Sequence, residues 1–252
     1  MTSVIRTAVQ DIPPIGRAEA ARLAQAEYQR FLDMLRGLEA DDWGRPTDCT
    51  RWTVQDVAAH IVGETEAFAS LREFAHQWRL GPRVKREIGA PELIDGVNEV
   101  QVRERRSLSP AQLIERMASR AEAAVRRRAA LPAPVRALPV PFPEPIGRRS
   151  VAYLVDLVIT RDVWMHRVDI TRAADTALEL TPEHVGLLVA DVVSDWSSTH
   201  VDPFLLELTG PAGGTFVRGE SQASTRVDAV EFVRVVSGRA TGDGVLANPL
   251  PL

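Results

Sequence analysis

The residues best suited to chemistry lie in the segment "RDVWMHRVDITRA", where Asp162 and His166 stand four positions apart. Val155 and Ile159 precede them at helical spacing, so one face of a helix carries apolar residues and then a carboxylate and an imidazole. An unpaired carboxylate in a protein core is costly. Asp162 therefore needs a partner, and either His166 or a metal ion can serve.

A third candidate ligand is His60, which lies between apolar residues in "DVAAHIVGE" and is expected to point inward. Gly63 costs about 1 kcal/mol relative to alanine inside a helix, but it would let another element approach closely. One histidine from this helix and the Asp162/His166 pair from another give three N/O ligands. Three protein ligands leave one position open, as in catalytic zinc sites, and bundle cores often assemble such sites from facing helices.

The same residues also allow a structural interpretation without a metal. Asp162 and His166 can form an ordinary helix salt bridge, and Glu64, four residues after His60, can pair with that histidine. The residue pattern alone leaves both interpretations open.

Composition limits the class of protein. The chain has 252 residues, of which 45% are hydrophobic and 25% charged, which is ordinary for a globular protein with one large domain or two small ones. A net charge of −4 argues against nucleic-acid or acidic-membrane partners. The arginine-rich pieces at 103–107 and 126–128 are expected to be solvated helix faces.

Cys49 is the only cysteine, so an intramolecular disulfide is excluded, and a small buried thiol is expected rather than a nucleophile. The first residues lack the apolar core of a signal peptide, and no stretch approaches the roughly 20 apolar residues of a membrane span. We therefore expect a cytoplasmic protein. Lys85 is the only lysine among 30 basic residues, a bias typical of GC-rich genomes such as those of actinobacteria.

Helical periodicity dominates the first two-thirds of the chain. Thr53 with Asp56, and Ser109 before Pro110, are helix-start signals. On the helix that carries Asp162, the arginines Arg161 and Arg167 fall on other faces and are expected to reach water. Helices are predicted over residues 17–39, 54–79, from Pro91 onward, 110–130, 149–174 and 182–198, with a proline-rich loop or extended crossover at 131–149.

The last part of the chain has a different pattern. Residues 204–219 read as a β-hairpin around a Gly/Pro turn, residues 224–228 as a further strand, and the following segment as a helix ended by Gly238. We predict a mainly α protein, in which an antiparallel helical bundle (1–178) is followed by a small α/β C-terminal domain (179–252).

Two stretches resemble the mycothiol-dependent maleylpyruvate isomerase family, a branch of the DinB-like helical bundles. The first is "LRGLEADDWGRPTDCTRWTVQDVAAHIVGE" and the second is "TRDVWMHRVDITRA". The weaker "GRAT" segment and the hairpin before it are similar to the small sterol-carrier-like C-terminal domain of many members. The resemblance implies that His60, Asp162 and His166 bind a divalent metal, usually zinc. In the isomerase, a glutamate is expected where this chain has Asp162.

The resemblance also implies chemistry with a small thiol, mycothiol. A zinc-bound thiol is deprotonated, and the thiolate is the nucleophile. The thiolate either adds to a cis double bond and leaves after rotation, or attacks an electrophile and stays attached. Arg239, in "SGRATG", is the candidate that holds a substrate carboxylate, with Arg218 and Arg234 as rivals.

We therefore expect a metal-dependent isomerase or transferase that takes a small-molecule substrate and mycothiol, without nucleic-acid or membrane partners, as a monomer or homodimer. Two other classes stay open. One is a non-catalytic metal-binding protein, and the other is a structural bundle without a metal.

Overall fold

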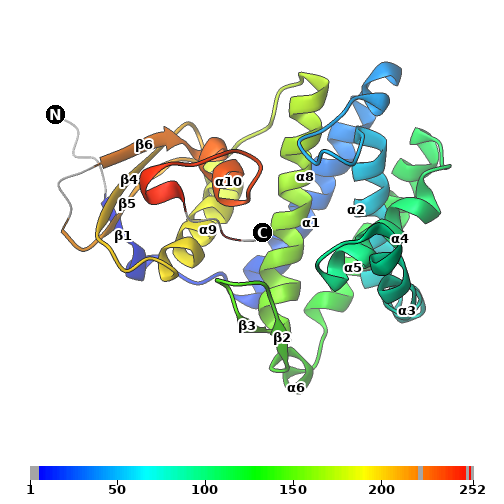
Figure 1. Ribbon diagram of the computed structural model, residues 1–252, viewed down its shortest axis with the longest axis horizontal. Helices are drawn as coiled ribbons and strands as arrows, with labels where there is room; N and C mark the ends of the chain where they lie inside the picture. The colour runs from blue at the N-terminus through cyan, green and yellow to red at the C-terminus, as the bar shows by residue number, and fades with distance from the viewer. Residues whose placement is uncertain (1–5, 221–223, 248–249, 251–252) are drawn as a thin grey trace. The chain divides into compact units, whose positions relative to one another are not determined.

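The computed structural model describes residues 6–220, 224–247 and 250, and contacts within it define two compact units (Figure 1). The first unit is a helical bundle made of residues 17–136 and 162–178. The second is an α/β unit made of the described residues of 1–16, 137–161 and 179–252.

This division differs from the predicted boundary between residues 178 and 179. Two earlier segments join the α/β unit, and one of them contains the short strand β1 (Arg6–Ala8), which pairs with a strand near residue 216. A three-residue strand has too few positions to show a periodicity, so its partner can be found only in three dimensions.

The bundle is built around α2, which contacts α3, α4 and α5, while α1 packs on α5. Its core joins apolar side chains of α1, α2, α5 and α8, including Phe31, Ile61, Met117 and Ile170. The helices are α1 (Arg17–Arg36), α2 (Val54–Ala69), α3 (Leu71–Ile88), α4 (Leu93–Arg105), α5 (Pro110–Ala129), α6 (Ala133–Arg136) and α8 (Ile159–Ala174).

Helix α2 begins where the sequence predicted but ends earlier. Thr53 accepts a hydrogen bond from the backbone N–H of Asp56, whose side chain in turn accepts from Thr53, so the predicted capping box is confirmed. The predicted continuation to residue 79 is wrong, because Ser70 is extended (φ −144°, ψ 118°). Its side chain accepts from the backbone N–H of Glu73 and starts α3. A serine that bonds to nearby backbone competes with helix continuation.

Two arginines of α8 contradict the expectation that they reach water. Arg161 and Arg167 are only 1% and 2% exposed. Arg167 pairs with Glu27 of α1 at 2.7 Å. Arg161, in the first turn of α8, belongs to the α/β unit and pairs with Asp191 and Asp195 of that same unit. Helical spacing assigned both to polar faces, but their carboxylate partners come from distant parts of the sequence.

The α/β unit contains a four-stranded sheet in the order β1-β5-β4-β6. The predicted hairpin is confirmed, since β4 (Phe204–Thr209) and β5 (Gly214–Arg218) pair antiparallel with Leu206 opposite Phe216. The predicted strand β6 (Ser224–Asp228) is also present and runs parallel to β4.

Two helices pack on this sheet, α9 (Leu187–Ser198) and α10 (Ala229–Val236) (Figure 1). Trp196 of α9 lies 5.0 Å from Phe204 and 5.4 Å from Phe232 between ring centroids, which places it at the centre of the core. The remaining elements of the unit are β2 (Pro139–Pro141), β3 (Arg148–Ser150), α7 (Val151–Tyr153) and the π-helical segments Leu154–Val158 and Pro182–Gly186.

Helix α7 and the first π-helical segment lead directly into α8, as the predicted helix over 149–174 requires. Within the described part of the chain, every helix is too short or too polar to cross a membrane.

The buried pair of Glu27 and Arg167 gives a test of this packing. Glu27→Ala leaves a buried guanidinium without its carboxylate and should lower the free energy of unfolding by about 3–5 kcal/mol in urea denaturation. Glu19→Ala removes a solvent-exposed pair with Arg22 and should cost less than about 1 kcal/mol. Equal losses in the two variants would contradict the buried-pair assignment.

Candidate metal centre

The three predicted ligands meet inside the bundle. His60 comes from α2, and Asp162 and His166 come from adjacent turns of α8. The His60 Nε2 lies 3.1 Å from one oxygen of Asp162, and the His166 Nε2 lies 3.5 Å from the other. One ligand atom from each residue lies within 4.8 Å of the other two. Two imidazole nitrogens and a carboxylate therefore converge on one point.

The opposite nitrogen of His166 is held by a buried carboxylate. The Nδ1 of His166 lies 2.9 Å from Asp169 Oδ2, and Asp169 is fully buried. The thiol of Cys49 donates to the same carboxylate oxygen at 3.4 Å. A carboxylate behind a histidine fixes the ring orientation and leaves the other nitrogen to face a metal.

His60 is oriented by an amide in the same way. Its Nδ1 lies 2.7 Å from Oε1 of Gln101 on α4, and the amide nitrogen of Gln101 donates to Gln77 at 2.9 Å. Because Gln101 presents its oxygen to His60, the Nδ1 is the donor in this hydrogen bond, and the Nε2 faces Asp162. The Nε2 is thus the ring nitrogen that can face a metal.

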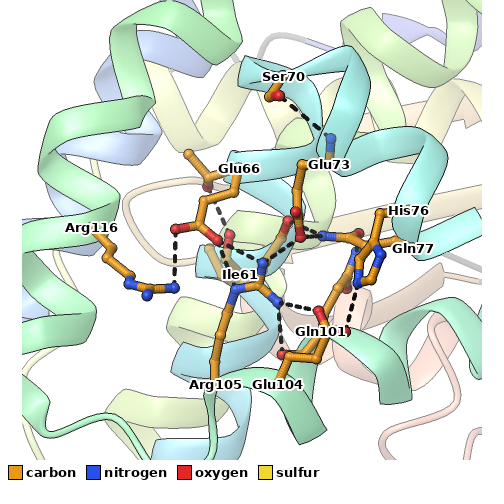
Figure 2. A network of polar contacts seen from close by, with 12 residues as sticks. Ile61, Glu66, Ser70, Glu73, His76, Gln77, Gln101, Glu104, Arg105 and Arg116 are labelled. Carbon is orange, nitrogen blue, oxygen red and sulfur yellow. Dashed lines mark hydrogen bonds and ion pairs between the residues drawn. The ribbon is translucent and has the colours of Figure 1, made fainter.

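A larger polar network continues from Gln101 and Gln77 (Figure 2). Arg105 of α4 donates to the backbone carbonyl of Gln101 at 3.1 Å and pairs with Glu66 and Glu73 at 2.6 and 2.7 Å. Arg105 is 3% exposed, which corrects the expectation that residues 103–107 form a solvated face. The amide of Gln77 also donates to Glu73. The network thus fixes α2, α3 and α4 around the amide that orients His60.

Gly63 permits this close approach, as the sequence predicted. A Cβ at this position would lie 2.5 Å from the Cβ of Gln101 and 3.1 Å from a guanidinium nitrogen of Arg105. Real Cβ contacts are longer, so only glycine lets α4 come this near to α2.

The electrostatics of the centre favour a positive charge. Burial lowers the pKa of His166, but the carboxylates of Asp162 and Asp169 outweigh this effect and raise the pKa to about 10. The proton on His166 therefore acts as the cation that balances the surrounding carboxylates. A divalent metal ion in the same place would supply that charge, so the donor set and its electrostatics fit a metal.

Glu64 does not pair with His60, because both ring nitrogens of the histidine face Gln101 and Asp162. Burial, reinforced by Asp162, raises the pKa of Glu64 well above its ordinary range. Its Oε2 is buried and has no hydrogen-bond partner among the residues that the structure describes. The alternative in which His60 and Glu64 form a structural pair is therefore not what the structure shows.

Cys49, His166 and Asp169 form a second group whose ligand atoms lie within 4.8 Å of one another. Here the thiol and the Nδ1 of His166 both point to Asp169 at hydrogen-bond distance, and the Nδ1 lies 3.9 Å from the sulfur. These hydrogen bonds account for the geometry without an ion. We therefore assign this group to the support of His166.

The predicted substrate arginine, Arg239, lies in the α/β unit just after α10, where its backbone N–H bonds to the carbonyl of Arg234. Its role stays a prediction. Of the rivals, Arg234 is buried and pairs with Glu231 at 2.6 Å, while Arg218 donates to the backbone of Ser197.

The sequence pattern missed the supporting residues Gln101 and Trp52. Gln101 lies on a helix with no recognisable motif, and its amide gave no signal of a role. Trp52 stands with its ring centroid 5.0 Å from His60 and 6.1 Å from His166. Trp52 stands in "RWT", just before the Thr53 cap and inside the first stretch that resembles the family, but nothing in the sequence assigned it a separate role.

Comparisons with known proteins agree with this architecture. Residues 24–171 match the family described as the mycothiol maleylpyruvate isomerase N-terminal domain. The crystal structure of the mycothiol-dependent maleylpyruvate isomerase is similar, with a TM-score of 0.56, 16% identity and coverage of 93% of each chain. The crystal structure of a single-histidine mutant of that isomerase has the same TM-score and coverage at 15% identity. No curated protein matches the chain. The structural likeness shows the fold, and it confirms the predicted DinB-like helical class.

The contact between Gly63 and Gln101 can be tested by adding one methyl group. Alanine normally stabilises a helix interior by about 1 kcal/mol relative to glycine. Gly63→Ala should instead lower the free energy of unfolding by about 1–3 kcal/mol, because the packed helices must separate. The hydrogen-bonded Nδ1 proton of His60 should also disappear from the NMR spectrum.

The matched control is Gly44→Ala, where an added Cβ would meet no atom within 4 Å. It should change stability by less than about 0.5 kcal/mol. A stable Gly63→Ala protein that retains the His60 proton signal would contradict the close approach of α4.

Proposed function

The chain belongs to the mycothiol maleylpyruvate isomerase N-terminal domain family, and from this premise we propose that it is a metal-dependent enzyme that uses mycothiol on a small electrophilic substrate. The observation that carries the proposal is the convergence of His60, Asp162 and His166 inside the region that matches the family. Asp169 and Gln101, behind the two imidazoles, support it further.

We assign His60, Asp162 and His166 as the ligands of a divalent metal, most simply zinc. The set of two histidines and one carboxylate is typical of catalytic zinc sites, which keep a position open for a further ligand. When bound, such an ion favours the thiolate form of a coordinated thiol. Asp169 and Gln101 hold the two rings in place, and the thiol of Cys49 holds Asp169.

The reaction follows from thiolate chemistry. In an isomerisation, the thiolate adds to a cis double bond, the resulting single bond rotates, and the same carbon–sulfur bond breaks to return the thiol. In an S-transfer, the new carbon–sulfur bond remains. After an addition, the neighbouring carbon takes up a proton, and in a substitution the leaving group departs from the attacked carbon. Both reactions demand less general-base catalysis from the protein than hydrolysis does.

The family name favours isomerisation, whereas Asp162 favours a different electrophile from that of the isomerase, in which a glutamate is expected. The substrate therefore stays open within one thiol-dependent reaction class. Arg239 is our candidate for holding a substrate carboxylate, since a guanidinium binds a carboxylate through two parallel hydrogen bonds.

The metal assignment predicts the metal content of two histidine variants and of a histidine control. Protein purified without a histidine tag should contain about one divalent ion per chain, and His60→Ala or His166→Ala should lose most of it. Both variants should also unfold at lower temperature, because a ligand that binds the native state stabilises it.

His76→Ala is the matched control, since His76 is a partly exposed histidine of α3 that pairs with Glu104. It should retain the ion. Full metal content in both His60→Ala and His166→Ala would refute the ligand assignment, and Glu64 would then be the first residue to examine.

The thiol mechanism predicts that turnover depends on mycothiol. A panel of electrophiles that includes maleylpyruvate should react only when the thiol is present, at fixed metal content. The rate should rise with pH until the thiol is fully ionised. In the same assay, Arg239→Ala should raise KM for a carboxylate substrate by about tenfold or more without loss of metal.

Arg226→Ala, which removes an exposed arginine from β6, should leave KM unchanged. Equal turnover with and without mycothiol would discard the thiol mechanism and favour metal-assisted hydrolysis.

A further inference from the structure

Arg128, in the last turn of α5, is a cation buried in the helical bundle. It is 3% exposed, which corrects the expectation that residues 126–128 form a solvated face. Its Nε and Nη1 are buried and have no hydrogen-bond partner among the residues that the structure describes. Buried guanidinium groups are normally paired, so these open donors point to an acceptor that comes from a ligand.

Two aromatic rings hold the guanidinium in place. Its central carbon lies 5.5 Å from the ring centroid of Tyr28 on α1 and 5.8 Å from that of Phe68 on α2. Ring faces at these distances stabilise a positive charge. They satisfy neither Nε nor Nη1 by a hydrogen bond. The rings therefore fix the position of the group while its donors stay open.

Glu64 lies between this guanidinium and the candidate metal centre. His60, Glu64 and Phe68 follow one another at intervals of four residues, so they share one face of α2, each about 6 Å further along the helix. The first of them contacts Asp162 and the last contacts Arg128. This face of α2 therefore leads from the centre past Glu64 to the open donors.

The electrostatics of Glu64 agree with this order. Burial has the largest effect on its pKa and raises it, the charge of Asp162 raises the pKa further, and the charge of Arg128 lowers it. Burial and Asp162 prevail, so the pKa lies well above its ordinary range. A neutral carboxyl group donates a hydrogen bond. An anion beside Arg128 would then meet a second donor instead of a second negative charge.

From this arrangement we propose that Arg128 is a substrate-binding residue, whose guanidinium holds a carboxylate of the electrophile while the reacting carbon lies at the candidate metal centre. The inference rests on the proposed function. It narrows the substrate to anions whose carboxylate is several bonds away from the reacting carbon, because about two turns of α2 separate Phe68 from His60. The centre opens to solvent at Asp162, whose side chain is 23% exposed.

This assignment is independent of that of Arg239, because Arg128 belongs to the bundle that contains the centre and Arg239 to the α/β unit.

The test measures the binding of glutarate, a dicarboxylate without a reactive double bond, to the full chain by calorimetry. Glutaramide, its neutral diamide, is the probe of equal length and should bind at least about tenfold more weakly. Arg128→Met removes the donors but keeps an apolar side chain between the two rings. It should weaken glutarate binding by about tenfold or more, equivalent to about 1.4 kcal/mol.

Two further measurements separate a binding role from a structural one. Because the open donors make no hydrogen bond within the described chain, Arg128→Met should leave the unfolding temperature unchanged or raise it. In the unmodified chain, the Nε–H signal of Arg128 in the NMR spectrum should shift when glutarate is added, but not when glutaramide is added.

The matched control is Arg126→Met, which removes an exposed arginine of the same helix that pairs with Glu122. It should bind glutarate as tightly as the unmodified chain. Equal binding by Arg128→Met and Arg126→Met would overturn the assignment, and so would an Nε–H signal that glutarate does not move. A lower unfolding temperature of Arg128→Met would assign the guanidinium to packing and contradict the proposal.

Turnover measurements distinguish this inference from the proposed function. If glutarate binds at Arg128 but no electrophile requires mycothiol, the carboxylate site stands and the proposed reaction fails. If turnover requires mycothiol but KM for a carboxylate-bearing electrophile is the same in Arg128→Met and Arg126→Met, the proposed reaction stands and the assignment of Arg128 fails.

Discussion

The structure of the bundle depends on how it balances negative charge in its interior. Asp162 and Asp169 place two carboxylates on one face of α8, and Asp169 has no exposed surface. Carboxylates at such positions are stable only next to a positive charge or several donors. The imidazole of His166 supplies a donor to Asp169, and either a proton on His166 or a metal ion supplies the charge. Residues of α2, α4 and the loop at residues 49–52 contact one another or these carboxylates around the centre.

The same contacts serve both packing and the candidate centre. The amide of Gln101 can orient His60 only if α4 lies against α2, and α4 can lie there only because residue 63 has no side chain. Arg105 then closes this contact by pairing with Glu66 of α2 and Glu73 of α3. A change in the packing of α4 is therefore also a change in the geometry of the centre.

Local signals in the sequence predicted much of this structure. The capping residues Thr53 and Ser109 start helices as expected, and the spacing of Asp162 and His166 placed both on one face. Other features depend on contacts that periodicity does not encode. Arg161 and Arg167 occupy faces that helical spacing marks as polar, but both are buried and paired with carboxylates from distant parts of the sequence. The strand around Thr7 can be recognised only from its pairing with β5.

The exposure of the three candidate ligands indicates where this chain can differ from its relatives. The side chains of His60 and His166 are 2% and 5% exposed, whereas that of Asp162 is 23% exposed. A substrate therefore reaches the centre past the carboxylate, since protein covers the two imidazoles. An aspartate is one methylene shorter than the glutamate that the family resemblance leads us to expect in the isomerase, so it leaves more space on the exposed side of the centre. The histidines are covered by the residues that orient them, so the partly exposed carboxylate is the candidate ligand that a small molecule can contact most directly.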